Sequence, residues 1–391
     1  MSVAFKIGQY NIKNSVILAP MAGITDSPYR QIHLAHGVGL AVSEMVLANT
    51  QMLHQGESLK HLEIQDLAPE IYQQYQVPRV MQLLGYDPQA MGNLAKLIVE
   101  HNLADIIDIN MGCPAKKVVK KAAGSALMAE PETVKAILEQ VVAHAHNKPV
   151  SLKMRTGVDL EHKNALQLAL LAQDIGVKSI VIHGRTRADL FNGQAEYDTI
   201  AQVKQELEIP VIANGDVDSL EKYLYVKDYT NADGIMLGRA SQGNPWLMQK
   251  LVAFATKTKY IEPNLLDKFV VVMKHIELIY QTYEPFLSYK IARKHFIWYL
   301  EQLFPQVFTT KTKNNLESEQ YIQKHIVLNS EQHKQIDYFY TNLYTSAESR
   351  TLDSTKYEEV YSWKKGFTTL NSALEQTLFI QSCYAKLKNW L

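Results

Sequence analysis

The sequence predicts an α/β fold: a (β/α)8 TIM barrel followed by a smaller all-helical domain that carries an insertion. Up to about Trp246, eight short apolar runs alternate with longer amphipathic segments, and eight strands alternating with helices are typical of a closed barrel. After Trp246, apolar residues recur only at helical spacing. We therefore expect a barrel domain over residues 1–246 and a helical domain over residues 247–391.

Composition limits the class of protein. The chain has 391 residues, no net charge and an ordinary hydrophobic fraction of 47%, which excludes a uniformly cationic protein. Two distant cysteines, Cys113 and Cys383, cannot form a disulfide framework. No apolar run reaches membrane-spanning length, and the first residues lack a signal-peptide pattern. We expect a cytoplasmic monomer without a metal site or a membrane partner.

The expected strands are short apolar runs. They are Val16–Pro20, Leu40–Glu44, Arg79–Leu83, Ile106–Asn110, Val150–Arg155, Ser179–His183, Val211–Asn214 and Gly234–Leu237. The helical stretches between them include Pro88–Asn102, Pro131–His146, Asn164–Ile175 and Thr199–Leu207. Two of these begin with proline, which the first turn of a helix accepts.

Polar and small residues gather at the ends of these strands, where barrel enzymes build their active sites. In chain order they are Pro20, Met21, Ala22 and Gly23; Glu44; Gln82; Asn110 and Cys113; Lys153 and Arg155; His183 and Arg185; Asn214, Gly215 and Asp216; Gly238 and Arg239. Any one of them could be a capping or structural residue. Together, at eight strand ends, they predict one site.

The last two strand ends are typical of a phosphate site. Glycines at 215 and 238 would let backbone N–H groups approach an anion, and Arg239 would supply charge. The alternative is that both glycines only permit tight turns. No G-x-G-x-x-G follows a strand, so a phosphorylated cofactor inside the barrel is favoured over a Rossmann site.

Lys153 and Gln82 indicate a flavin. A reduced flavin gains negative charge on the pyrimidine side of its ring, which an ammonium group stabilises. An amide offers a donor and an acceptor to the same ring. The alternative for Lys153 is an ion pair with a carboxylate such as Glu44. For Cys113, which follows a buried strand, the alternative is a small buried hydrophobe.

Five motifs resemble the tRNA-dihydrouridine synthase family, and most closely its bacterial B-type branch. They are Ala19–Asp26 (APMAGITD), Asp108–Val118 (DINMGCPAKKV), Lys153–Gly157 (KMRTG), His183–Arg187 (HGRTR) and Gly238–Ala240 (GRA). The resemblance runs from about Ile7 to Leu303. It implies an FMN enzyme that uses NADPH to reduce a uridine in the tRNA D-loop, at position 17 for the B type.

The resemblance also implies a role for each residue. Pro20, Met21, Ala22, Gln82, Lys153 and His183 would bind the flavin, and Asn214, Gly215, Asp216, Gly238 and Arg239 its phosphate end. Asn110, Arg155 and Arg185 would contact the uridine. Hydride transfer to C6 requires an acid that protonates C5, and Cys113 would be that acid if its thiol stays protonated.

A uridine in folded tRNA must be turned out of its stack, which requires a second surface to hold the backbone. The candidates are Lys116 and Lys117, beside Cys113, and Lys290, Arg293 and Lys294 on an expected helix. The alternative for these cations is a solvated face. The alternative for the whole chain is an FMN barrel oxidoreductase acting on a free small molecule such as a dihydropyrimidine. A further alternative is an RNA-binding protein without turnover.

The helical domain should contain helices over Leu265–Tyr283 and Ser288–Leu303, separated by Pro285. Residues 306–362 interrupt the family pattern and are expected to be an insertion. In it, Ser330 could cap a helix over Glu331–Tyr344 with Ile336, Phe339, Tyr340 and Leu343 on one face. The insertion could be an extra helical hairpin, or a further RNA contact because it is rich in tyrosine.

Overall fold

The computed structural model describes residues 3–48, 69–308, 328–346 and 352–391. The chain forms two units, Met1–Ala240 and Ser241–Leu391, each with its own hydrophobic core. Trp246 belongs to the second unit's core, where its ring lies 6.0 Å from that of Tyr299. Within these described ranges, no helix is both long and apolar enough to cross a membrane.

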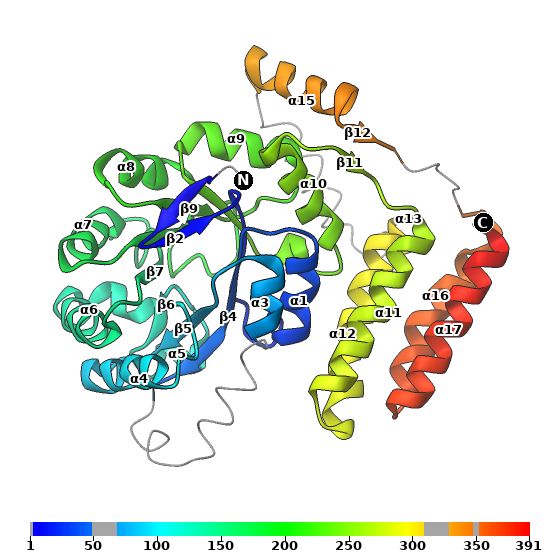
Figure 1. Ribbon diagram of the computed structural model, residues 1–391, viewed down its shortest axis with the longest axis horizontal. Coiled ribbons are helices and arrows are strands. Elements are labelled where there is room, and N and C mark those ends of the chain that lie inside the picture. Colours follow the sequence, from blue (N-terminus) through cyan, green and yellow to red (C-terminus); the bar gives the residue numbers. More distant parts are fainter. Residues whose placement is uncertain (1–2, 49–68, 309–327, 347–351) are drawn as a thin grey trace. The chain divides into compact units, whose positions relative to one another are not determined.

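The first unit is a closed parallel barrel, which confirms the predicted fold class (Figure 1). Its strands are β3 (Val16–Leu18), β4 (Leu40–Leu47), β5 (Val80–Leu84), β6 (Ile106–Met111), β7 (Val150–Arg155), β8 (Ser179–His183), β9 (Val211–Asn214) and β10 (Gly234–Leu237). The last four have the predicted bounds. The first ends at Leu18 rather than Pro20, because a proline nitrogen cannot donate to the ladder.

Helices surround the barrel strands (Figure 1). They are α1 (Ser27–Ala35), α3 (Pro69–Tyr75), α4 (Pro88–Glu100), α5 (Lys116–Val119), α6 (Pro131–Ala145), α7 (Ala165–Ile175), α8 (Asp198–Glu206) and α9 (Leu220–Thr230). The predicted helices agree with α4, α6, α7 and α8 to within two residues at either end. Proline stands at the start of α4 and α6, as expected.

Hydrocarbon fills one end of the barrel. The N-terminal hairpin of β1 (Phe5–Ile7) and β2 (Tyr10–Ile12) contributes buried side chains to a cluster with residues near the strand beginnings, such as Ile17 and Ile106. Burial of apolar surface is the main stabilising contribution here. The polar residues of the strands are therefore left for the opposite end, where the strands finish.

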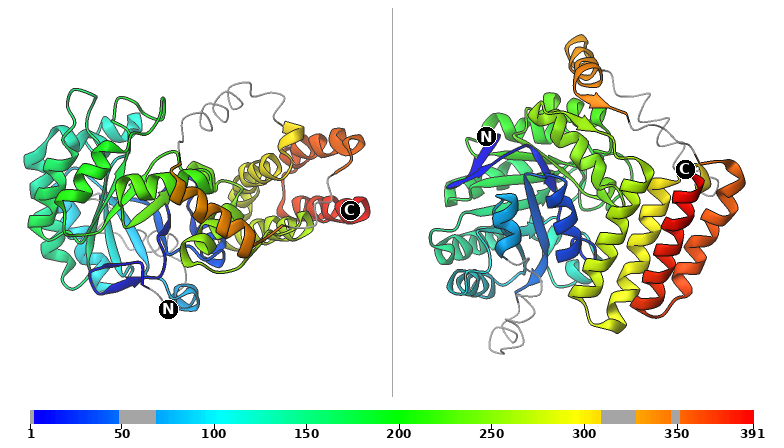
Figure 2. Two further views of the ribbon diagram at one scale, coloured as in Figure 1. Left: turned by 90° about the horizontal axis from the view of Figure 1, so that it is seen from above. Right: turned by 45° about the vertical axis from the view of Figure 1, so that its right-hand side comes forward.

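The second unit is helical (Figure 2), with α10 (Pro245–Thr256), α11 (Leu265–Thr282), α12 (Pro285–Leu303), α13 (Pro305–Phe308), α16 (Tyr357–Thr369) and α17 (Ala373–Trp390). Its core contains several packed aromatic rings, and those of Phe296 and Phe367 are 4.1 Å apart. Pro285 was expected to separate two helices but instead begins α12, because the first turn tolerates a missing N–H.

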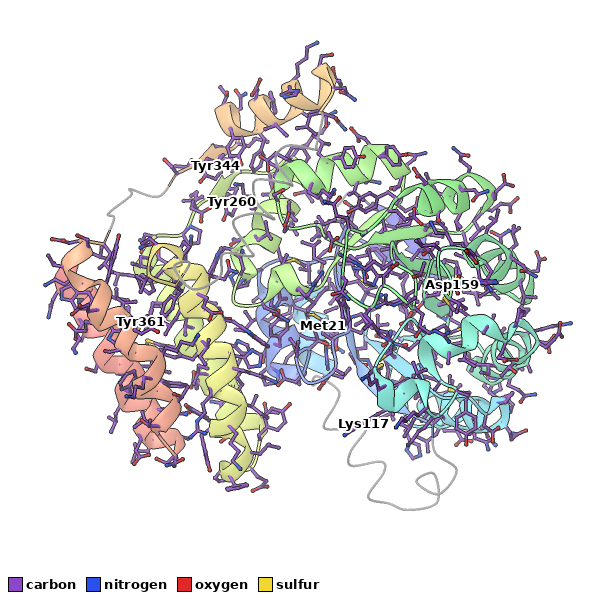
Figure 3. All side chains as sticks on the ribbon, turned by 180° about the vertical axis from the view of Figure 1, so that it is seen from behind. Met21, Lys117, Asp159, Tyr260, Tyr344 and Tyr361 are labelled. Atoms are coloured by element: carbon purple, nitrogen blue, oxygen red, sulfur yellow. The ribbon has the colours of Figure 1, made fainter. Side chains whose placement is uncertain are left out.

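Part of the predicted insertion is folded onto this unit. Helix α15 (Ser330–Asn342) leads into β12 (Tyr344–Thr345), which pairs in parallel with β11 (Tyr260–Ile261); Figure 3 labels Tyr260 and Tyr344. The cap of α15 is Asn329 rather than Ser330, and it forms a capping box with Gln332. On the predicted apolar face Phe339 is buried, and its ring lies 5.5 Å from that of Phe254. Residues 309–327, with Tyr321, and 347–351 lie outside the described ranges.

Candidate active site

Two amides meet inside the barrel, at the strand ends of β5 and β6. Asn110 Nδ2 donates to Gln82 Oε1 at 2.8 Å, and both side chains are buried. Gln82 Nε2 donates to Asp108 Oδ2 at 2.6 Å. Each amide nitrogen carries two hydrogens, so each keeps one for another partner. This amide pair, Gln82 and Asn110, can offer N–H groups to two acceptors at once.

The cysteine loop, residues 111–115, is held from both sides. Asn110 Oδ1 accepts from Gly112 N at 3.1 Å and from Cys113 N at 3.0 Å. The Cys113 carbonyl accepts from the N and Oγ of Ser125 at 3.1 and 2.9 Å, and the Gly112 carbonyl accepts from Arg155 Nε at 2.7 Å. Cys113 itself is only half-buried, so its thiol is not sealed in hydrocarbon.

Lys153 is a buried cation without an ion pair among the described residues. Its Nζ donates to Asn214 Oδ1 at 3.0 Å, and its exposed fraction is 9%. Burial, followed by repulsion from Arg155, lowers its pKa to about 8. The alternative of a Lys153–Glu44 pair is wrong, since Glu44 accepts instead from Gly23 N. The Asp108 carboxylate attracts this ammonium, but its hydrogen-bond acceptor is the neutral Asn214 amide, so Nζ keeps donors for an anionic ligand.

His183 is a neutral donor. Burial and the surrounding cations, first among them Lys153, lower its pKa to about 2. Its Nε2 lies 3.3 Å from Arg185 Nη1, and a guanidinium can only donate. The proton of the neutral imidazole is therefore on Nδ1, which can donate a hydrogen bond to an acceptor.

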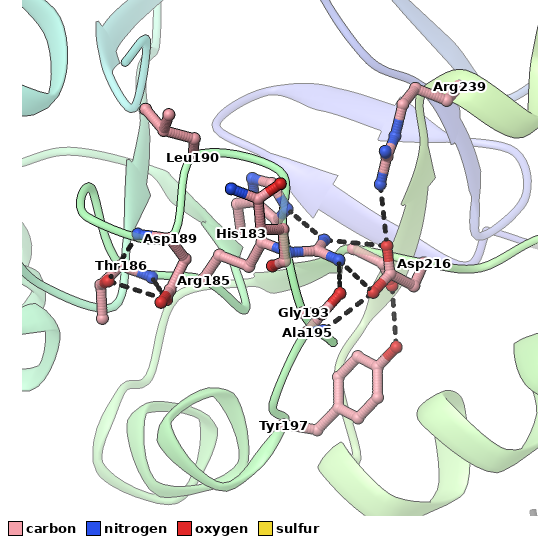
Figure 4. A network of polar contacts seen from close by, with 12 residues as sticks. His183, Arg185, Thr186, Asp189, Leu190, Gly193, Ala195, Tyr197, Asp216 and Arg239 are labelled. Carbon is pink, nitrogen blue, oxygen red and sulfur yellow. Dashed lines mark hydrogen bonds and ion pairs between the residues drawn. The ribbon is translucent and has the colours of Figure 1, made fainter. Parts of the chain in front are cut away.

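One carboxylate, after β9, joins two arginines that follow the strands on either side of it, β8 and β10 (Figure 4). Asp216 accepts from Arg185 Nη1 and Nη2 at 2.8 and 2.6 Å, from Arg239 Nη2 at 3.0 Å and from Ala195 N at 2.8 Å. Its side chain is thus engaged with cations, so any contact of Asp216 with a phosphate would use its backbone. We call Arg185, Asp216 and Arg239 the aspartate network.

Two glycines near this network differ in what the protein requires of them. Gly215 has φ +128°, and a Cβ there would lie 2.6 Å from Ala195 Cβ, so only glycine fits. At Gly238 a Cβ would meet only Met21 Sδ at 3.6 Å and Ala19 Cβ at 3.8 Å, which are ordinary contacts. The protein alone leaves room at Gly238, as expected where a ligand lies close to the backbone.

The two predicted substrate arginines differ. Arg185 uses all five N–H groups, on Asp216, His183 and the carbonyls of Asn192 and Gly193. Arg155 donates through Nε to Gly112 and through Nη1 to the carbonyls of Thr186 and Leu190, and no described residue accepts from its Nη2. Only Arg155 therefore has donors available without rearrangement.

The remaining predicted flavin residues lie in the turn after β3. Pro20 and Met21 are half-buried, and Ala22 is exposed. Met21 N donates to Thr25 Oγ1 at 2.8 Å, which fixes the turn. Figure 3 labels Met21, whose sulfur is the atom nearest to a Cβ at Gly238. The first and last strand ends therefore meet, as closure of the barrel requires.

The predicted RNA-contacting cations are on the surface of both units. Lys116 and Lys117 are exposed on α5 (Figure 3 labels Lys117). On α12, the Nζ of exposed Lys290 lies 3.5 Å from the Phe286 ring centroid. Arg293 is instead engaged, donating to the Leu370 carbonyl at 2.8 Å, and Lys294 is half-buried.

Two site residues were not predicted from the sequence. Asp108 lies beneath the amide pair, and strand alternation could have revealed it, since it is two residues before Asn110. Phe191 is 54% exposed, with the guanidinium carbons of Arg155 and Arg239 at 5.4 and 5.5 Å from its ring centroid. It lies on a loop between β8 and α8, where no sequence periodicity marks a contact.

Comparisons with known proteins agree on one family. A family model described as Dihydrouridine synthase (Dus) matches residues 17–336. The chain is 46% identical to tRNA-dihydrouridine synthase B of Pasteurella multocida (strain Pm70), over 77% of this chain and 88% of that protein. It is 45% identical to tRNA-dihydrouridine synthase B of Escherichia coli (strain K12), over 80% of this chain and 94% of that protein.

Among solved structures, a 2-naphthoyl-CoA reductase in complex with 2-naphthoyl-CoA is similar in fold alone. Its TM-score is 0.50 at 11% identity, covering 63% of this chain and 51% of that one.

Proposed function

Because this chain belongs to the dihydrouridine synthase family of flavin-dependent oxidoreductases, we propose that it reduces a uridine of tRNA to 5,6-dihydrouridine. The uridine is in the D-loop, at position 17, and NADPH is the electron donor. Cys113 gives the proton to C5. The observation that carries this proposal is the half-buried thiol on a loop tied to the buried amide pair.

The donor set suits FMN. Gln82, Lys153 and His183 would hold its ring, since a buried ammonium, a free amide N–H and an imidazole N–H are donors for an anionic or carbonyl-rich edge. Arg239 and the glycines at 215 and 238 would hold its phosphate end. When bound, the flavin supplies to C6 the hydride that it takes from NADPH. Lys153 stabilises negative charge beside the ring.

The uridine would be held by the groups left free on the other side of the site. Asn110 keeps one amide hydrogen, and Arg155 keeps the two on Nη2, so both can donate to the carbonyl oxygens of a uracil ring. Hydride transfer to C6 leaves negative charge shared between C5 and the adjacent C4 carbonyl, and an acid must then protonate C5. Cys113, on the loop that Asn110 fixes, is placed to be that acid.

A tRNA substrate also needs contacts beyond the base. The exposed Lys116 and Lys117 are three and four residues after Cys113 and would contact phosphates next to the flipped uridine. Lys290, Arg293 and Lys294 of α12 would contact the backbone elsewhere. We also propose a cytoplasmic location, where tRNA is found.

The test is Cys113→Ala, assayed with unmodified tRNA and NADPH, with the dihydrouridine mapped to its position. Loss of an acid should lower kcat by roughly 10²–10⁴-fold while the protein remains yellow. Cys383→Ala, at a cysteine buried in the helical unit, is the matched control and should retain activity. Undiminished turnover in Cys113→Ala would refute the role, and reduction of free uracil but not tRNA would favour the small-molecule oxidoreductase.

A further inference from the structure

A carboxylate lies beneath the amide pair. Asp108 is 2% exposed, and its oxygens accept from Ser151 Oγ and Gln82 Nε2, both at 2.6 Å. No ion pair to it is formed within the described residues, and burial raises its pKa to about 6. All of its hydrogen bonds come from neutral donors, and the charge of Lys153 offsets only part of the cost of its burial. The directions of these hydrogen bonds give the carboxylate a role besides balancing the charge of Lys153.

The carboxylate of Asp108 fixes which group donates and which accepts in each hydrogen bond of the amide pair. A carboxylate only accepts, so Gln82 must turn its NH₂ group toward Asp108 and its Oε1 toward Asn110. Asn110 must then turn its NH₂ group toward Gln82. Its Oδ1 is left to accept from the two N–H groups of the cysteine loop. An amide has no such preference by itself, because its two ends have nearly the same shape.

We infer that the carboxylate of Asp108 is a positioning group that orients both amides, Gln82 and Asn110, and through them the cysteine loop. The inference rests on the proposed function. Asp108 touches no reacting atom in this arrangement. It determines which hydrogens of the amide pair face the cofactor and the uracil, and it keeps the acceptor that holds Cys113 N in place.

The first test compares Asp108→Leu with Asp108→Asn. Leucine removes the acceptor, so the amides can flip and the cysteine loop loosens. We expect kcat to fall about a hundredfold with unchanged tRNA affinity. Asparagine can still accept through Oδ1 if the Ser151 hydroxyl turns to accept from its NH₂ group, so kcat should stay within about tenfold of wild type. Equal losses in both variants would overturn the inference, as would a leucine variant within threefold of wild type.

A second readout does not depend on activity. The rate of Cys113 alkylation by iodoacetamide in flavin-free protein should rise at least threefold in Asp108→Leu. Cys383 is buried, so it should not react under the same conditions. Ile106→Ala is the control, because it removes buried volume from the same strand below Asp108. It should lower Tm without changing kcat or alkylation. Equal alkylation of the leucine variant and wild type would contradict the inference, whether or not tRNA is the substrate.

If the leucine variant fails to fold, a swapped pair keeps the inference testable. In Asp108→Asn combined with Gln82→Glu, the asparagine NH₂ donates to the new carboxylate, which in turn accepts from Asn110. In the flavin-free protein, Cys113 should then be alkylated at the wild-type rate. Residue 82 no longer offers an N–H to the flavin, so the visible spectrum of the flavin-bound protein should shift. Faster alkylation in this pair would overturn the inference.

Discussion

The barrel mouth and the surface of the helical unit present charge in different ways. In the barrel, Arg155 and Arg185 are 1% and 2% exposed, and backbone carbonyls or Asp216 fix their guanidinium groups. On α12, Lys290 is exposed, and its charge lies against an aromatic ring that is itself 70% exposed. Buried, hydrogen-bonded groups hold one geometry. Exposed lysines adapt to a partner whose backbone carries regular charge.

This comparison explains why single substitutions should act so differently in the two units. In the barrel, removing one partner leaves another buried charge unpaired, which costs several kcal/mol. On the surface, each cation contributes a small, salt-dependent amount.

The largest effect in the aspartate network is expected for Asp216→Ala. It leaves Arg185 buried without its carboxylate, and breaking such a pair costs about 3–5 kcal/mol. Because the Asp216 side chain is 20% exposed, water should reduce the cost to about 2–3 kcal/mol. We expect a lower Tm and weaker FMN binding, measured by calorimetry and fluorescence.

The matched control is Asp159→Ala, an exposed aspartate paired with exposed His162. It should change neither Tm nor FMN affinity, since surface pairs contribute little. If both variants lost stability equally, the contrast between buried and exposed charge would not hold.

A smaller effect should follow the titration of Lys153, whose pKa is lowered to about 8. Above that pH the ammonium loses its proton, so FMN affinity should fall by up to roughly tenfold per pH unit. For the flavin-free protein the sign is opposite. Its folded form binds fewer protons than the unfolded chain between pH 8 and 10.5, so its unfolding free energy gains a contribution that rises with pH.

Binding of FMN measured from pH 7 to 9.5 checks this prediction, with Lys153→Met as the control. The variant should bind weakly at every pH and lose the slope near pH 8. A wild-type affinity that is independent of pH in this range would show that the charge of Lys153 does not contribute to binding.

The smallest effect is expected for Lys290→Ala on α12. Loss of one phosphate contact should weaken tRNA binding a few-fold and reduce the slope of log K against log salt by about 1, with kcat at saturating tRNA unchanged. Lys274→Ala on α11 is the control, because that lysine is exposed and paired with Glu277. An equal change in both variants would mean that α12 has no special role in holding tRNA.

Helices and strands were predicted correctly where the sequence pattern is compatible with only one backbone conformation. The runs Val150–Arg155 and Gly234–Leu237 were bounded correctly, because each is a short buried run that is followed closely by a glycine, Gly157 or Gly238. Asn329 and Ser330 are both good caps, and only the backbone distinguishes them. Pro285 is compatible with either a break or a first turn.

The sequence predicted which residues form the site, but not the hydrogen bonds between them. Strand ends placed Gln82, Asn110 and Lys153 together, and the structure has them on neighbouring strands. That Arg185 has no N–H to spare, while Arg155 does, follows from the conformation of the loop at residues 186–193. Loop conformation is not encoded in hydrophobic periodicity, so sequence reasoning could not separate the two arginines.

The hairpin of β1 and β2 packs buried side chains against the beginnings of the barrel strands, so a ligand of the proposed site would enter from the end where the strands finish. If the proposed function is right, a nicotinamide donor and a tRNA nucleotide would both have to approach the site from that end.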